Sequence, residues 1–296
     1  MAYLARFYDP QDEQLPSLLA RNKTDSEALT EQVRSILAAV QEEGDEALFR
    51  FAKQFDKASL SELRVSEKEI LDAEGRVPDD LKQALAVAYH NIKAFHARQR
   101  PDGEQLVVAP GVELSRKIVP IQRVGLYIPG GTAPLFSTTL MLAVPAQVAL
   151  CPSVVLCTPP DSDGNVHPAI LYAASMCGVK EIYKIGGAQA IAAMAYGTQS
   201  IEAVDKIFGP GNQYVTEAKI QVSGSCCAID MPAGPSEVMV LASPASNPSY
   251  VASDLLSQAE HGRDSQAMLV ICAEQTQGFA FLDRVEQAME DQLATL

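Results

Sequence analysis

Three short apolar runs in this chain end in glycine, and beside the glycines of each lies an aromatic or amide side chain that could bind a cofactor. They are Tyr127-Ile128-Pro129-Gly130-Gly131, Ile185-Gly186-Gly187-Ala188-Gln189 and Phe208-Gly209-Pro210-Gly211-Asn212. Glycine lets the backbone adopt positive φ and approach a ligand closely, and a helix that begins there offers free N–H groups to an anion. Together the runs favour a nucleotide cleft at the carboxyl edge of a parallel sheet. The chain has no GxGxxG fingerprint, so an ordinary strand-to-helix turn remains the alternative for each run.

A second candidate site involves Gln258 and His261, which lie three residues apart in a segment predicted to be helical. At this spacing both side chains lie on one face near the end of the helix, with Gly262 as a plausible cap. Imidazole is a good zinc ligand and an amide oxygen is a less common one. The pair predicts half of a zinc site, because two ligands do not complete a tetrahedral shell. A solvated glutamine beside a surface histidine fits the same spacing.

The loop at residues 230–237 contains two prolines, and its Ser236 leads into a predicted strand. A rigid loop can hold a hydroxyl in fixed geometry for a substrate, although a simple connector between two modules explains it equally well. His90, His96 and His167 are predicted to pack or to face solvent. The adjacent Cys226 and Cys227 are predicted to pack as small apolar residues of a strand rather than to bind metal.

The elements that would position these residues change in kind along the chain. Apolar residues recur at helical spacing in residues 24–57 and again in 66–98, with a break near Pro78. From residue 127 to about 237, short β-rich runs alternate with helical ones, which is typical of a parallel sheet with crossover helices. In residues 237–296 predicted strands again alternate with helices. This second pattern indicates a sheet that lacks its later strands.

The predicted fold class is therefore α/β, with an N-terminal helical section and two Rossmann-like parallel-sheet modules, the second incomplete. We expect residues 1–126 with 238–296 to form a first domain, and residues 127–237 to form an inserted domain that carries the cleft.

The composition excludes some classes of partner. A net charge of −14 with a pI near 4.7 repels a phosphate backbone or an anionic membrane surface, so neither nucleic acid nor membrane is expected as a partner. The six cysteines form no CxxC pair, and most lie in apolar stretches typical of reduced, buried thiols. With no signal peptide and no long apolar run in the sequence, we expect a cytoplasmic protein.

Five longer segments, in this order, resemble the signature segments of the histidinol dehydrogenase family. They are VGLYIPGGTAPLFSTTLML, KIGGAQAIAAMAYGT, VDKIFGPGNQYVTEAK, AIDMPAGPSEVMVLA and ASDLLSQAEHGRDSQ. The likeness includes GDEALFRFAKQFDK in the helical section, and so covers nearly the whole chain. The resemblance implies the N-terminal two-thirds of a zinc- and NAD-dependent alcohol dehydrogenase, which oxidises L-histidinol to L-histidine in histidine biosynthesis and assembles as a homodimer.

The resemblance also implies roles for individual residues. The positions that match NAD contacts of the family are Tyr127, Gln189 and Asn212. Ser236 matches a substrate contact, and Gln258 and His261 match two zinc ligands that also face the substrate. In the family, the zinc ion holds the imidazole and amino groups of the substrate and orients its alcohol for hydride transfer.

The sequence departs from the family pattern in one large respect. The family's Glu-His acid–base pair, an aspartate ligand and a further histidine ligand from the partner subunit match nothing up to Leu296. The sequence therefore predicts no catalytic acid or base among these residues, and we expect no turnover by this chain alone. Two alternatives remain open: a non-catalytic nucleotide-binding paralogue, and a related dehydrogenase of another small alcohol.

Overall fold

The computed structural model describes residues 4–20, 26–130, 134–232, 237–260 and 265–294. Contacts divide the chain into two compact units, one of Met1–Asp25 with Ala233–Leu296 and the other of Ser26–Pro232. This division differs from the expected one, because the helical section belongs with the α/β module rather than with the C-terminal segment. The physical reason is that the helices of residues 26–97 bury their apolar faces on the sheet and crossover helices of that module.

The larger unit is built on a five-stranded parallel sheet in the order β5-β4-β3-β6-β7. Its strands are β3 (Arg123–Tyr127), β4 (Ser153–Thr158), β5 (Glu181–Lys184), β6 (Lys206–Phe208) and β7 (Ala228–Ile229). The first strand of the sheet along the chain, β3, is the central one. β4 and β5 follow it to one edge, and β6 and β7 then extend the sheet to the other edge. The predicted parallel sheet is confirmed, and its order creates a topological switch point between β3 and β6, where open α/β sheets bind ligands.

Helices cover both faces of this sheet. On one face lie α2 (Ser26–Glu43), α3 (Asp45–Phe51), α8 (Gly187–Tyr196) and α9 (Gln213–Ser223). On the other lie α4 (Glu67–Arg76), α5 (Asp79–Ala97), α6 (Phe136–Val148) and α7 (Pro168–Met176). Successive residues of each strand point to opposite faces and so pack in two separate cores. Tyr127 and Val155 lie in the core beneath α2, α3, α8 and α9, and Leu126 and Leu156 lie in the core on the other face. The predicted break at Pro78 separates α4 from α5.

A segment of the helical section closes one edge of the sheet. After α3 the chain forms a short π-helix, η1 (Ala52–Asp56), and then runs antiparallel to β5. Lys184 N donates to Leu63 O at 2.8 Å, and Val65 N donates to Ile182 O at 2.8 Å. The antiparallel direction places residues that precede Leu63 beyond the carboxyl end of β5.

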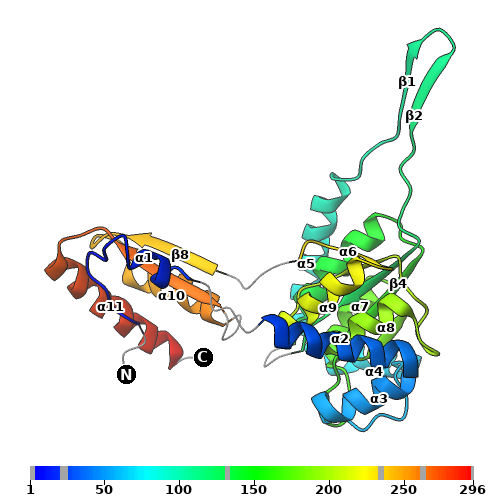
Figure 1. Ribbon diagram of the computed structural model, residues 1–296, viewed down its shortest axis with the longest axis horizontal. Coiled ribbons are helices and arrows are strands. Elements are labelled where there is room, and N and C mark those ends of the chain that lie inside the picture. The colour runs from blue at the N-terminus through cyan, green and yellow to red at the C-terminus, as the bar shows by residue number, and fades with distance from the viewer. Residues whose placement is uncertain (1–3, 21–25, 131–133, 233–236, 261–264, 295–296) are drawn as a thin grey trace. The chain divides into compact units, whose positions relative to one another are not determined.

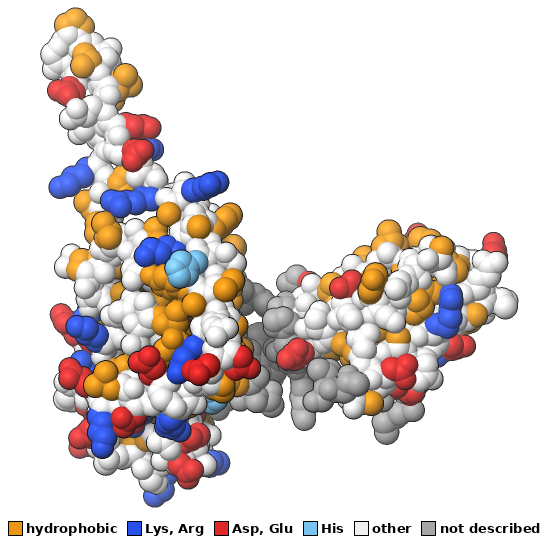
Figure 2. Space-filling model, turned by 180° about the vertical axis from the view of Figure 1, so that it is seen from behind, with side chains coloured by type: hydrophobic (Ala, Val, Ile, Leu, Met, Phe, Trp, Pro, Cys, Tyr) orange, Lys and Arg blue, Asp and Glu red, His pale blue; other side chains and the backbone are white. Residues whose placement is uncertain are grey.

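A two-stranded antiparallel hairpin, β1 (Glu104–Ala109) with β2 (Val112–Arg116), extends away from the rest of the larger unit (Figure 1). Every residue of both strands is exposed. Apolar side chains are visible on the surface of the hairpin (Figure 2). The exposed large apolar residues of its two strands are Leu106, Val107, Val108, Val112 and Leu114. The sequence predicted a β-rich run at β2 but did not predict β1.

The smaller unit contains a parallel pair, β8 (Glu237–Ala242) with β9 (Gln266–Ile271), and three helices among the described residues. These helices are α1 (Leu15–Leu18), α10 (Pro248–Ala259) and α11 (Gln275–Leu293). Phe281 and Val285 of α11 lie in its core, and Arg6 forms ion pairs with Asp283 at 2.7 Å and with Glu286 at 2.6 Å. Throughout the described ranges, the helices are too short or too polar to cross a bilayer.

Candidate functional site

The three glycine-ended runs converge on one cavity of about 520 Å³ at the carboxyl edge of the larger sheet. Tyr127 reaches it from the end of β3, Gln189 from the first turn of α8, and Asn212 from the residue before α9. The runs follow β3, β5 and β6, and parallel strands end at the same edge. The sequence therefore predicted this convergence correctly.

Tyr127 is buried, and its hydroxyl accepts a hydrogen bond from the backbone N–H of Gly187 at 3.0 Å. Burial raises the pKa of the Tyr127 hydroxyl, which therefore stays protonated at neutral pH. The tyrosine thus links the end of β3 to the N-terminus of α8 and lines the cavity with its ring.

Gln189 is almost fully buried, at 2% exposure, although it is an amide. Its position depends on Gly187. The backbone φ of Gly187 is +66°, a value that residues other than glycine rarely adopt. A Cβ at Gly187 would lie 2.8 Å from Gln189 Oε1. The glycine therefore leaves space for the glutamine side chain beside the cavity.

Asn212 is the N-cap of α9, and its Oδ1 accepts from Tyr214 N and Val215 N at 3.1 Å each. The cap holds the amide group at the cavity in one orientation, with its oxygen directed to the helix. Its Nδ2 carries donors that this capping interaction does not use.

An ion pair between a buried lysine and a partly buried aspartate fixes the loop that leads to Asn212. Lys219, at 4% exposure, pairs with Asp230 and donates to Gly209 O at 2.8 Å, while Asp230 Oδ2 accepts from Gly209 N at 2.8 Å. Gly209 has a φ of +137°, and a Cβ there would lie 2.2 Å from Tyr127 O. The β6 loop therefore lies directly against the end of β3.

Two helix N-termini at this edge already use several of their N–H groups within the chain. Tyr127 accepts from Gly187 N, and Asn212 accepts from Tyr214 N and Val215 N. The expectation that glycine turns leave these groups free for an anion is therefore corrected in part. The side chains that line the cavity satisfy them instead.

The helical section supplies a wall of the cavity that the sequence did not predict. Gln32 and Ile36 of α2, with Phe55 and Asp56 of η1, line the same space as Tyr127. Asp56 Oδ2 is buried and has no hydrogen-bond partner in the part of the chain that the structure describes. Burial raises the pKa of this carboxyl from 3.8 to about 6. No spacing or local motif marks Asp56, because its place depends on how distant segments pack.

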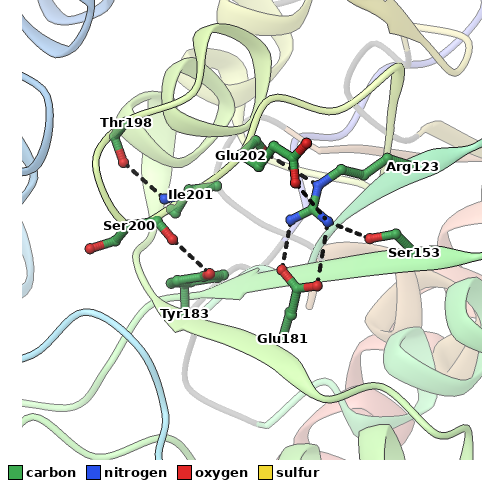
Figure 3. A network of polar contacts seen from close by, with 8 residues as sticks. All are labelled: Arg123, Ser153, Glu181, Tyr183, Thr198, Ser200, Ile201 and Glu202. Atoms are coloured by element: carbon green, nitrogen blue, oxygen red, sulfur yellow. Dashed lines mark hydrogen bonds and ion pairs between the residues drawn. The ribbon is translucent and has the colours of Figure 1, made fainter.

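The opposite, amino edge of the sheet holds a polar network that the cavity does not include (Figure 3). Arg123 at the start of β3 pairs with Glu181 at 2.6 Å and with Glu202 at 3.6 Å, and it donates to Ser153. Tyr183 donates to Ser200 O at 2.8 Å. These contacts tie the first residues of β3, β4 and β5 together and indicate a structural role.

Of the predicted zinc and substrate residues, the structure describes only Gln258. It lies in the last turn of α10, and its buried Nε2 has no hydrogen-bond partner among the described residues. Rotating the amide by about 180° would bring Oε1 to the same place, where it could ligate a metal. His261 and Ser236 lie outside the described residues. Within the described ranges, no three His, Cys, Asp or Glu side chains gather as a metal site.

The side chains expected to pack or to face solvent do so in most cases. His90 contacts Ala86 O at 2.6 Å on its own helix, and His167 accepts from Ala169 N as the N-cap of α7. Cys227 is buried as predicted, whereas Cys226 is exposed.

Comparisons with known proteins agree with this architecture. A family model described as Histidinol dehydrogenase matches residues 19–296. A histidinol dehydrogenase of Bacteroides thetaiotaomicron is 55% identical over 287 residues, which are 97% of this chain and 66% of that protein. The Escherichia coli K12 protein of the same name is 52% identical over 273 residues, which cover 92% of this chain and 61% of that relative. The chain thus spans just under two thirds of the length of these curated relatives.

Solved structures give a consistent result. The crystal structure of histidinol dehydrogenase from Elizabethkingia anophelis matches with a TM-score of 0.85 and 48% identity, over 97% of this chain and 65% of that one. Methylmalonate-semialdehyde dehydrogenase from Oceanimonas doudoroffii matches with a TM-score of 0.51 and 14% identity, over 92% of this chain and 51% of that one. The second match shows a likeness of fold alone.

Proposed function

The chain belongs to the histidinol dehydrogenase family, and we propose that it provides the NAD cleft of an enzyme that oxidises L-histidinol to L-histidine. One observation carries the proposal: Tyr127, Gln189 and Asn212 meet at a single cavity beside the switch point of the sheet. NAD bound there would supply the hydride acceptor. Tyr127 and Asn212 would hold the cofactor between the ends of β3 and β6, and Gln189 would contact it from α8.

Zinc and the substrate form the second part of the proposal. Gln258 and His261 would ligate a zinc ion that binds the imidazole and amino groups of L-histidinol, and Ser236 would contact the substrate. The support from geometry is the buried Nε2 of Gln258 in the last turn of α10, which has no hydrogen-bond partner among the described residues. Calorimetric titration with zinc tests this part: His261→Ala and Gln258→Ala should each weaken binding at least tenfold, and unchanged affinity in both variants would contradict it.

The NAD site is tested by measuring NAD affinity calorimetrically in variants that separate binding from helix capping. Asn212→Ala removes both the amide and the cap, whereas Asn212→Asp keeps the capping oxygen and removes the Nδ2 donors. Asn247→Ala is the matched control, since Asn247 caps α10 through Ser249 N at 3.0 Å and belongs to the other unit.

We expect both Asn212 variants to bind NAD at least fivefold more weakly, with no change in Asn247→Ala. Gln189→Ala should weaken binding similarly, and His90→Ala should not. If neither Asn212 substitution changes NAD affinity, the assignment of the cleft is wrong. NADH formation from L-histidinol, followed by absorbance, then tests the complete reaction.

A homodimer is also part of the proposal, and its support is the apolar hairpin of the larger unit. Leu106 and Leu114 are paired across β1 and β2 and are 61% and 56% exposed. Exposed apolar side chains gathered in this way mark interaction surfaces. Analytical ultracentrifugation should find a dimer that Leu106→Lys with Leu114→Lys converts to a monomer. An unaltered protein that is monomeric at micromolar concentration would contradict this part.

A further inference from the structure

Asp56 occupies a defined place at the cleft. It is the last residue of η1, and the chain that follows it pairs with the edge of β5 through Leu63 and Val65. Since this segment runs antiparallel to β5, Asp56 precedes it beyond the carboxyl end of that strand. There it lines the same cavity as Pro159 and Pro160, which directly follow β4.

The carboxylate is suited to a ligand that donates hydrogen bonds. Asp56 Oδ2 is buried without a partner in the described part of the chain, and a buried carboxylate oxygen left in this state is costly. The neighbouring Tyr127 hydroxyl is already bonded to Gly187 N. A ligand with two adjacent hydroxyls would satisfy the carboxylate through charge-assisted hydrogen bonds.

The sheet order indicates which part of a dinucleotide lies there. In doubly wound sheets of this order, an acidic residue near the end of the second strand binds the 2′-hydroxyl of the adenosine ribose. Here that strand is β4, and the Pro159-Pro160 pair that directly follows it offers no side-chain acceptor. Asp56 brings a carboxylate to the same cavity from the helical section.

We propose that Asp56 binds the hydroxyls of the adenosine ribose of the cofactor and makes the cleft selective for NAD over NADP. This inference rests on the proposed function, because it assumes that the cavity binds a dinucleotide. A 2′-phosphate would replace one donor hydroxyl with negative charge beside a carboxylate that has no ion-pair partner among the described residues, and it would be repelled.

Calorimetric titrations of NAD and NADP into the unaltered protein, Asp56→Asn and Asp72→Asn test the inference. Asp72 is an exposed aspartate on α4 and serves as the matched control. The unaltered protein and the control should prefer NAD at least tenfold. Asp56→Asn should bind NAD about tenfold more weakly, which corresponds to ~1.4 kcal/mol, and its preference for NAD should fall towards unity. An unchanged NAD-to-NADP ratio in a folded Asp56→Asn variant would overturn the inference.

A measurement on the unaltered protein alone keeps the inference testable if the Asp56 variant does not fold. ADP should bind at least fivefold more tightly than 2′-deoxy-ADP, because only ADP offers the 2′-hydroxyl. Equal affinities would overturn the role of Asp56, while NAD binding that still depends on Asn212 would leave the proposed function standing. Failure of the unaltered protein to bind either dinucleotide would overturn the proposed function and the inference with it.

Discussion

Replacing Lys219 with methionine should destabilise the larger unit by about 2–3 kcal/mol. Removing one partner of a buried ion pair costs about 3–5 kcal/mol, because the other charge remains buried without compensation. The side chain of Lys219 is 5% exposed and that of Asp230 is 29% exposed, so water partly solvates the remaining carboxylate and lowers this cost. The lost bond from Lys219 Nζ to Gly209 O, at 2.8 Å, adds to it.

Urea unfolding followed by circular dichroism measures this effect, with hydrogen exchange of residues 206–223 as the local reading. Lys219→Met with Asp230→Asn should recover about 1 kcal/mol, because the amide removes the uncompensated charge and keeps an acceptor for Gly209 N. Lys68→Met, at an exposed position of α4, is the control. If Lys219→Met costs no more than Lys68→Met, or if the double variant is as unstable as the single one, the ion pair does not hold this loop.

Three further predictions concern the walls of the cavity. Gly187→Ala should cost about 1–2 kcal/mol in thermal unfolding and weaken NAD binding, because its φ of +66° disfavours a side chain and the new methyl group would displace Gln189; unchanged stability would contradict this. Tyr127→Phe should cost about 1–3 kcal/mol in urea unfolding, since it leaves the N–H of Gly187 without its acceptor, and a loss below 0.5 kcal/mol would show that water replaces the hydroxyl. For Asp56, the folded-state pKa is raised from 3.8 to about 6, so its contribution to stability is present below pH 4 and is lost as the pH rises through about 6. The stability of Asp56→Asn relative to the unaltered protein should therefore rise by about 1 kcal/mol between pH 4 and pH 7, a value that allows for the partial exposure of Asp56. If the free energies of unfolding of the two proteins change in parallel over this pH range, the pKa of Asp56 is not raised.

The sequence allows the sheet and the convergence of Tyr127, Gln189 and Asn212 to be predicted, because both follow from local patterns. Apolar runs that end in glycine identify the strand ends, and a parallel sheet brings such ends to one edge. The wall formed by Asp56 could not be predicted in this way. Helical periodicity shows that a helix buries one face, but it does not show which surface covers that face.

The same limit explains the two differences in the fold. Residues 24–57 and 66–98 were predicted to be helical, and the described residues there form α2, α3, η1, α4 and α5. Their assignment to a domain, however, depended on contacts with α8, α9, α6 and α7 that periodicity does not encode. Neither hairpin strand has a buried face, and only β2 was predicted, from its β-rich composition. Without a buried face, the alternation of polar and apolar residues that identifies a strand is not required.

The division into units has a consequence for synthesis on the ribosome. Arg6 pairs with Asp283, 277 residues later in the chain, whereas the larger unit is one continuous stretch, Ser26–Pro232. At about 5–20 residues per second, roughly 14–55 s separate the synthesis of these two partners. The larger unit can therefore complete its fold before α11, with which the N-terminal segment packs, has been synthesised. During this interval the segment around Arg6 is accessible to chaperones and proteases.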